Sequence, residues 1–199
     1  IGVDDTILYL HPIAQALGYI HQKGVVHRDV KSSNIFITTD GRPVLMDFGI
    51  MYSKGVESLS QYGAILGTPE YMSPEQAEGK IKADGRSDIY SLGVIMFECL
   101  TGQLPFRSDN HIATLHQIIH EDPPKVKEFN NRVPGWLAEI VACCLVKDRS
   151  LRIPDGYMLA DALWNKKIPV YKTNEFLNET NELNTNWIEN RNNDSGRFI

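Results

Sequence analysis

The residues best suited to chemistry lie in two short stretches near the start of the chain. Asp29 stands in the sequence His27-Arg28-Asp29, and Asn34 follows it by five residues. Asp47 lies eighteen positions downstream of Asp29. Phosphoryl transfer requires a carboxylate that accepts a hydroxyl proton, together with oxygen ligands for divalent ions. The spacing therefore predicts a phosphoryl-transfer site with Asp29 as the base and with Asn34 and Asp47 as metal ligands.

A small hairpin is predicted between the two aspartates. Two short apolar runs, 34–37 and 43–46, stand on either side of Asp40-Gly41, which is a strong signal for a hairpin turn. Each string of the site would be weak evidence alone, because short strings recur by chance. Their order around a predicted hairpin favours a functional interpretation over a purely structural one.

Helices are predicted over most of the remaining chain. Residues 6–23 carry apolar side chains at helical spacing, with Asp4 or Asp5 available as the N-cap and Gly24 placed to end the helix. Residues 88–100 are apolar on all faces, which predicts the buried axis of the domain. Further helices are predicted to begin at Ser73 and to span 112–120, 136–146 and 155–164. The predicted fold class is α+β and mainly α-helical.

Composition divides the chain into two parts. The chain has 199 residues, of which 42% are hydrophobic and 23% are charged, so residues 1–164 can bury a core as one compact domain. Nine asparagines occur between Asn165 and Asn193, with few aliphatic residues. Residues 165–199 are therefore predicted to be an Asn-rich, weakly structured C-terminal tail.

Several classes of protein are disfavoured by the sequence. No apolar run approaches the roughly 18 residues that span a bilayer, and the first residues carry no secretion signal. We expect a cytoplasmic location, although the full-length protein could carry a membrane anchor outside this segment. The net charge of −5 and the pI near 5.7 argue against a nucleic-acid partner. An odd number of cysteines at apolar helical positions argues against a disulfide framework: Cys99, Cys143 and Cys144.

His116 and His120 are spaced like the two zinc ligands of a metalloprotease helix. Gln117, however, stands where that motif needs a glutamate as general base. No third ligand is evident in the sequence. Two ordinary helical histidines are therefore the preferred interpretation.

Residues 1 to about 164 resemble the C-terminal lobe of a eukaryotic-like, Hanks-type Ser/Thr protein kinase, a family with many bacterial members. Besides the phosphoryl-transfer motifs, residues 67–75 resemble the end of a kinase activation segment, with Ser73 where alanine is commoner. Residues 88–93 resemble the start of the central helix. The resemblance implies a protein-kinase-like fold, ATP and Mg²⁺ as cofactors with Mn²⁺ as a substitute, and Ser/Thr hydroxyls of proteins as acceptors.

The resemblance also implies roles for single residues. Lys31 matches the lysine that stabilises the transferring phosphoryl group in Ser/Thr kinases, and Thr68 matches the threonine that braces Lys31 and Asp29. Phe36 matches the floor under the adenine ring. The two predicted metal ligands are implied to share the ions that bridge the ATP phosphates.

Other matches imply structural roles. The aspartate matching Asp88 hydrogen-bonds the catalytic-loop backbone in relatives, and the glutamate matching Glu75 pairs with an arginine that fits Arg152. The histidine matching His27 packs under Phe48 and helps to align the metal-binding aspartate.

Arg28 places the chain with relatives whose activation segment is ordered by a phosphate, because its guanidinium can clamp a phosphorylated side chain. Ser60 is the favoured phosphate acceptor and Ser58 the second, with a simply solvated serine as the open alternative. Gly49 permits a backbone conformation that a side chain would hinder at the start of this segment.

Three parts of a kinase cannot be placed in this sequence. They are the Gly-rich phosphate cover, the strand lysine that binds the α- and β-phosphates, and the helix glutamate that holds that lysine. We therefore expect the N-terminal lobe to be missing here and to lie upstream in the full chain. The parent protein is then expected to be active and this fragment to be inactive alone.

The leading hypothesis is a protein Ser/Thr kinase represented by its C-terminal lobe. The alternative is a non-catalytic docking or regulatory module. The joint presence of Asp29, Asn34 and Asp47 disfavours it. A small-molecule phosphotransferase is a weaker alternative, because relatives of that kind lack the 67–75 segment that cradles a polypeptide acceptor.

Overall fold

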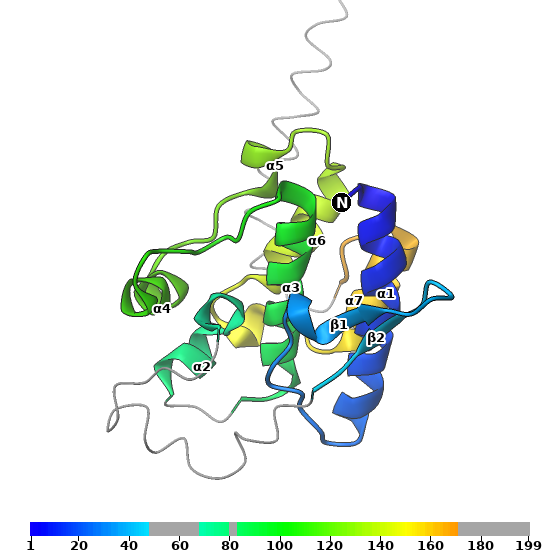
Figure 1. The fold of residues 1–199 in the computed structure, drawn as a ribbon, viewed down its shortest axis with the longest axis horizontal. Coiled ribbons are helices and arrows are strands. Elements are labelled where there is room, and N and C mark those ends of the chain that lie inside the picture. Colours follow the sequence, from blue (N-terminus) through cyan, green and yellow to red (C-terminus); the bar gives the residue numbers. More distant parts are fainter. Residues whose placement is uncertain (48–67, 80–82, 171–199) are drawn as a thin grey trace, which may run out of the picture. The chain divides into compact units, whose positions relative to one another are not determined.

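The long helix α3 (Gly85–Thr101) runs through the middle of the fold (Figure 1). The computed structural model describes residues 1–47, 68–79 and 83–170, and a compact unit spans Ile1–Pro169. Helices α1 and α7 pack against each other and against α3. Helices α2 and α4 also pack together, on the opposite side of α3 in the view of Figure 1.

Helices form nearly all of the regular structure. The α-helices of the described chain are α1 (Val3–Gln22), α2 (Pro74–Glu78), α3, α4 (His111–His120), α5 (Val126–Phe129), α6 (Gly135–Cys144) and α7 (Gly156–Asn165). Short 3-10 turns are η1 (Ser32–Asn34), η4 (Pro69–Tyr71) and η5 (Arg149–Leu151). The described residues contain one sheet, in which β1 (Ile35–Ile37) pairs antiparallel with β2 (Pro43–Leu45). The predicted class, α+β and mainly helical, is confirmed.

The burial of α3 follows from its sequence. Every residue from Ser87 to Phe97 is buried, which confirms the predicted buried axis. The helix begins before the predicted Asp88, because Asp84 caps it by accepting a hydrogen bond from the amide of Arg86 at 2.9 Å. It ends at Thr101 and is followed by the C-cap residue Gly102, whose left-handed conformation (φ 74°) closes the last turn.

Helix α1 is capped differently from the prediction. Gly2 is its N-cap residue, and no side chain caps the helix. The predicted cap by Asp4 or Asp5 is wrong: both lie inside the first turn, where their charges face the positive end of the helix dipole. The buried face consists of residues that recur three or four positions apart: Thr6, Leu10, Ile13, Ala14, Leu17 and Gly18.

The predicted hairpin is present. Phe36 of β1 lies opposite Val44 of β2. The amide of Thr38 donates to the carbonyl of Arg42 at 2.9 Å, and Gly41 adopts the left-handed conformation (φ 82°) that the loop needs. The hairpin packs against α1, so the helix that precedes the catalytic stretch also supports the sheet that follows it.

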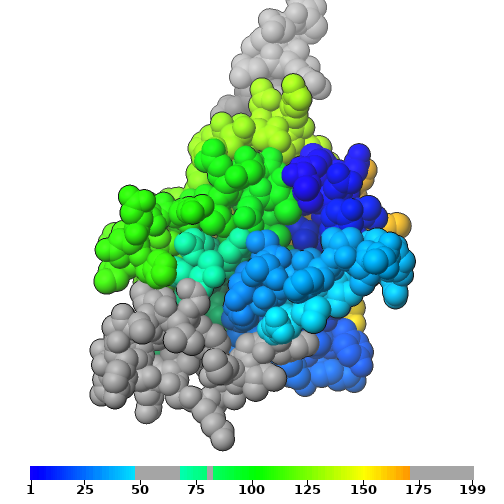
Figure 2. All heavy atoms as spheres, in the orientation of Figure 1, coloured from blue at the N-terminus to red at the C-terminus, as the bar shows by residue number. Residues whose placement is uncertain are grey.

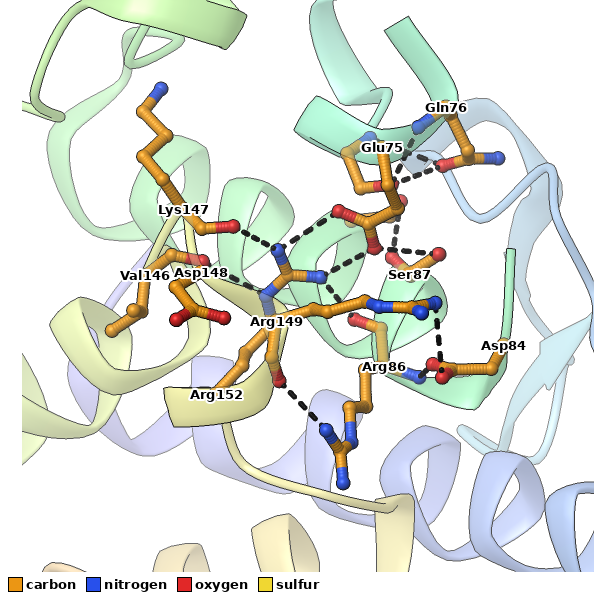
Figure 3. A network of polar contacts seen from close by, with 12 residues as sticks. Glu75, Gln76, Asp84, Arg86, Ser87, Val146, Lys147, Asp148, Arg149 and Arg152 are labelled. Atoms are coloured by element: carbon orange, nitrogen blue, oxygen red, sulfur yellow. Dashed lines mark hydrogen bonds and ion pairs between the residues drawn. The ribbon is translucent and has the colours of Figure 1, made fainter. Parts of the chain in front are cut away.

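A buried ion pair ties α2 to the connection between α6 and α7 (Figure 3). The Nη1 and Nη2 atoms of Arg152 lie 2.7 Å and 3.1 Å from the two carboxylate oxygens of Glu75. Ser87 of α3 donates its hydroxyl to the same carboxylate at 2.7 Å. The guanidinium also donates to backbone carbonyls, those of Arg86, Val146 and Lys147. Both buried charges therefore have the hydrogen bonds that make burial tolerable.

Helices α1 and α7 approach closely where two glycines face each other. A Cβ atom added to Gly156 would lie 2.2 Å from the carbonyl oxygen of Ala14 and 2.3 Å from the amide nitrogen of Gly18. Both of these atoms belong to the backbone of α1. They cannot move aside unless the whole helix shifts.

Gly156→Ala should destabilise the protein by about 1–3 kcal/mol, because the added methyl group overpacks the contact between α1 and α7. Thermal unfolding of the purified variant measures this change. Gly135→Ala is the matched control, since a Cβ at Gly135 would meet only the Nζ atom of Lys127 at 3.9 Å. The control should be neutral or slightly stabilising. Equal melting temperatures for the two variants would contradict the close approach.

Glu75→Gln should lower the free energy of unfolding by about 3 kcal/mol or more at pH 7, because the buried guanidinium of Arg152 loses its counter-charge. Burial alone raises the pKa of Glu75, but the hydrogen bonds and the charge of Arg152 outweigh burial and hold the pKa below its ordinary 4.5. The carboxylate's contribution is therefore present above pH 4.5 and is lost as the pH falls through the lowered pKa.

Urea unfolding at several pH values tests this expectation. The difference in the free energy of unfolding between the parent and Glu75→Gln should become smaller as the pH falls below 4.5. Glu78→Gln, an exposed change on the same helix, is the control and should alter stability by less than about 0.5 kcal/mol. A gap of the same size at low and neutral pH would show that the ion pair does not carry the effect.

Candidate active site

Three of the predicted site residues meet at the carboxylate of Asp29. The ammonium of Lys31 lies 2.8 Å and 3.1 Å from its two oxygens. The side-chain nitrogen Nδ2 of the buried Asn34 donates to the backbone carbonyl of Asp29 at 2.8 Å and to the Asp29 carboxylate at 3.1 Å. The turn η1 makes this meeting possible, since it folds the chain back within five residues of Asp29.

The orientation of Asn34 leaves one atom for another partner. Because the nitrogen of its side chain faces Asp29, the oxygen of the same amide is directed elsewhere. That oxygen is a ligand of the kind that hard divalent cations prefer.

Asp47 is brought to this region by the hairpin. The amide of Met46, the residue before it, donates to the carbonyl of Asn34 at 2.9 Å. Asp47 is exposed and has a left-handed backbone (φ 58°), which aspartate tolerates better than most side chains do. Asn34 is thus one partner of this backbone hydrogen bond, and Asp47 directly follows the other partner.

His27 joins the two halves of the site. Its side chain is buried, and burial lowers its pKa below the ordinary 6.5 despite the nearby acidic groups. The neutral ring donates from Nε2 to the carbonyl of Met46 at 3.2 Å, which leaves Nδ1 to accept the amide of Asp29 at 3.4 Å. One imidazole thus links the backbone of Asp29 to the residue before Asp47.

Asp88 holds the backbone that leads into Asp29. Its carboxylate accepts the amides of His27 and Arg28, each at 2.8 Å. His21, at the end of α1, lies 2.9 Å from the same carboxylate through Nε2. Arg28 has a left-handed conformation (φ 67°), which is unfavourable for an ordinary side chain unless neighbouring groups enforce it. The carboxylate on α3 supplies that enforcement.

The contact of His21 was not predicted from the sequence. The residue stands in the last turn of a helix, and its partner lies 67 positions away. A histidine six residues before His27 was the only available signal, and it named no partner.

The remaining predicted site residues are either exposed or outside the described residues. Phe36 is half exposed on β1, and Val44, its cross-strand neighbour, is also exposed. Thr68 is exposed at the start of η4, and its bracing of Lys31 and Asp29 stays a prediction. Four predicted residues lie outside the described residues: Phe48, Gly49, Ser58 and Ser60. Figure 2 shows residues 27–47, in blue to cyan, on one face of the molecule.

Other kinds of site find no support in the part of the chain that the structure describes. His116 and His120 are exposed with ring centroids 4.7 Å apart, but no cluster of three metal-ligating side chains occurs in residues 1–47, 68–79 and 83–170. Within the same ranges, no helix has the length and hydropathy of a membrane span. Two of the cysteines in the described residues carry free thiols, Cys99 and the buried Cys144.

Comparison with known proteins agrees with this geometry. The family description "protein kinase domain" matches residues 2–164. The serine/threonine-protein kinase PknL of Mycobacterium tuberculosis is 39% identical over 150 residues, which cover 75% of this chain and 37% of that protein. PknB of Mycolicibacterium smegmatis is 41% identical over 136 residues, covering 67% and 22%. The DNA damage-responsive serine/threonine-protein kinase RqkA of Deinococcus radiodurans is 37% identical over 152 residues, covering 76% and 22%.

The matched region thus spans between about a fifth and two fifths of the length of these relatives. The family match, residues 2–164, includes all of the residues that meet around Asp29, as well as α3 and the segment from Thr68 to Glu78. This chain belongs to the protein kinase family.

Proposed function

We propose that this chain is the catalytic C-terminal lobe of a protein Ser/Thr kinase, which transfers the γ-phosphate of ATP to hydroxyl groups of proteins. The observation that carries the proposal is the cluster of Asp29, Lys31 and Asn34, joined through His27 to the residue before Asp47. A base, a cation and metal-ligating oxygens are the groups that phosphoryl transfer needs from a protein.

Asp29 is the proposed base. Its carboxylate is half-buried and is oriented by two donors, Lys31 and Asn34, so it is held in one place before any substrate arrives. The ammonium of Lys31, 2.8 Å from this carboxylate, is close to where a phosphoryl group must approach the acceptor hydroxyl. A fixed positive charge there stabilises the negative charge that develops during transfer. Thr68 is proposed to assist both residues.

Asn34 and Asp47 are proposed to hold Mg²⁺, or Mn²⁺ in its place. An amide oxygen and a carboxylate fit a hard cation, and both residues stand at the open end of the hairpin. When bound with ATP, the ion neutralises charge on the phosphates. Phe36, half exposed on β1, is proposed as the floor of the adenine site.

The acceptors are proposed to be Ser and Thr hydroxyls of proteins. The relatives named above are all described as serine/threonine kinases, and Lys31 sits two residues after the proposed base. Neither a nucleic acid nor a membrane surface is proposed as a partner. Ser60, and then Ser58, is the proposed site of an activating phosphate that Arg28 would clamp.

The isolated lobe is proposed to be inactive. The Gly-rich phosphate cover and the strand lysine cannot be placed in this sequence, and we propose that an N-terminal lobe upstream supplies them. A cytoplasmic location of the lobe is proposed because the reaction consumes ATP. Residues 165–199 are proposed to form a tail outside the kinase domain.

The protein for this test is the chain extended upstream to include the proposed N-terminal lobe, called the upstream-extended chain. In it, Asp47→Asn should reduce phosphate transfer from ATP to background, because a neutral amide is a poorer ligand for Mg²⁺ than a carboxylate. Transfer of radioactive phosphate to a generic Ser/Thr protein substrate is the measurement. The chain of 199 residues alone is the comparison, and it should show no transfer.

Asp40→Asn is the matched control for this experiment. Asp40 is an exposed aspartate at the tip of the same hairpin, where it pairs with Arg42. The control should keep the parent activity. Transfer that survives Asp47→Asn would contradict the metal role, whereas a folded parent without any transfer would favour a docking module.

A further inference from the structure

The side chain of Gln76 on α2 bridges two segments of the proposed site. Its Nε2 atom donates to the carbonyl oxygen of Arg28 at 3.0 Å, across 48 positions of sequence. Gln76 directly follows residues 67–75, which resemble the segment that cradles a polypeptide acceptor in relatives. We call the described residues 68–79, which contain α2, the docking segment. Arg28 directly precedes the proposed base. One hydrogen bond therefore connects the docking segment to the catalytic loop.

Ser73 fixes the orientation of the Gln76 amide. The amide nitrogen and the hydroxyl of Ser73 both donate to Oε1 of Gln76, at 3.1 Å and 3.0 Å. Because Oε1 faces two donors and Nε2 faces a carbonyl, only one of the two amide orientations satisfies all three contacts. Ser73 is also the N-cap of α2 in a capping box with Gln76. The side chain is thus held by the helix from which it reaches out.

The peptide group that Gln76 contacts is the one that ends at Asp29. Its oxygen belongs to Arg28, and its nitrogen belongs to Asp29 and lies 3.4 Å from His27 Nδ1. The preceding amide, that of Arg28, is held by Asp88. The left-handed conformation of Arg28 (φ 67°) is unfavourable for an ordinary side chain, so contacts to the adjoining peptide groups help to maintain it.

A second contact of the same docking segment falls on the other side of the base. The hydroxyl of Tyr71 lies 2.7 Å from that of Ser32 and donates to the carboxylate of Glu98 at 2.8 Å. The segment 68–79 therefore contacts the loop both before and after Asp29.

We propose that Gln76 is a positioning residue for Asp29, through which the acceptor-docking segment sets the orientation of the base. The inference rests on the proposed kinase function and adds a residue to it. Gln76 touches no substrate; it acts by fixing the carbonyl of Arg28 and with it the peptide plane from which the Asp29 side chain projects. Loss of this contact should slow transfer and leave nucleotide binding in place.

Gln76→Glu isolates the proposed contact. A glutamate at this position keeps the shape of the side chain and the acceptor for Ser73, so the capping box of α2 is retained. It loses the only donor of the side chain, and its carboxylate faces the carbonyl of Arg28 with the wrong polarity. Gln76→Leu, which removes the cap contact as well, serves as the comparison for a loss of both functions.

The experiment uses the upstream-extended chain with ATP, Mg²⁺ and a Ser/Thr peptide. For Gln76→Glu, kcat should fall about 10- to 100-fold, since a misplaced catalytic group has effects of this size. The KM for ATP and the melting temperature should stay close to the parent values. Hydrogen–deuterium exchange of residues 27–31 should become faster, because the loop loses one of its anchors.

A charge control accompanies this variant. The double variant combines Gln76→Glu with Glu78→Gln, an exposed position on the same helix, so it has the net charge of the parent. It should show the same loss of kcat as Gln76→Glu alone. Recovery of kcat in the double variant would assign the effect to net charge and overturn the proposal.

The remaining outcomes separate the inference from the proposed function. A parent that transfers phosphate while Gln76→Glu keeps its kcat and its exchange rate would overturn the inference alone. Parallel losses of kcat, nucleotide binding and melting temperature would show that Gln76 merely holds α2 together, which also overturns it. A parent without transfer would refute the proposed function, and the exchange rate of residues 27–31 would still decide whether Gln76 anchors the loop.

Discussion

The geometry of the candidate site depends on a single buried carboxylate, that of Asp88. A buried charge costs several kcal/mol unless hydrogen bonds replace its hydration. Here the amides of His27 and Arg28 and the ring of His21 provide those bonds. The same bonds hold Arg28 in a conformation that an ordinary side chain avoids. The catalytic loop can therefore keep its shape only while α3 is buried in its place, so core packing and site geometry are one constraint.

The parts that the sequence predicted well are those with a local cause. The buried axis, predicted because residues 88–100 are apolar on all faces, and the Asp40-Gly41 turn each depend on a few neighbouring residues, and both were found in the structure. Contacts between distant segments were not predictable in this way. The contacts of His21 and Gln76 span 67 and 48 positions, and no pattern within either segment names its partner. The expected partners of Asp88 and Glu75 came from family resemblance, not from periodicity or spacing.

The ion pair of Glu75 and Arg152 shows why distance in sequence matters to the site. A buried ion pair is weak evidence for stability, because a hydrophobic pair of equal volume is often as stable. Unlike the ion pair, however, such a hydrophobic pair makes contacts that have no fixed direction. Arg152 donates to the carboxylate and also to three backbone carbonyls, so it fixes α2 relative to α3 and to the connection before α7 in one arrangement (Figure 3). A short helix of five residues cannot hold such a position by its own hydrogen bonds.

Two neighbouring residues of α2 therefore have different partners and different effects. Glu75 is anchored in the interior by Arg152 and Ser87, while Gln76 reaches the carbonyl before Asp29. Because adjacent residues share one backbone, a displacement of the interior anchor must also displace the amide that contacts the catalytic loop. Arg152 and Arg28 are linked in this way by hydrogen bonds to two residues that are joined by one peptide bond. The position of the proposed base is thus set from two sides, by Asp88 on the buried axis and by a helix that is itself fixed to the core.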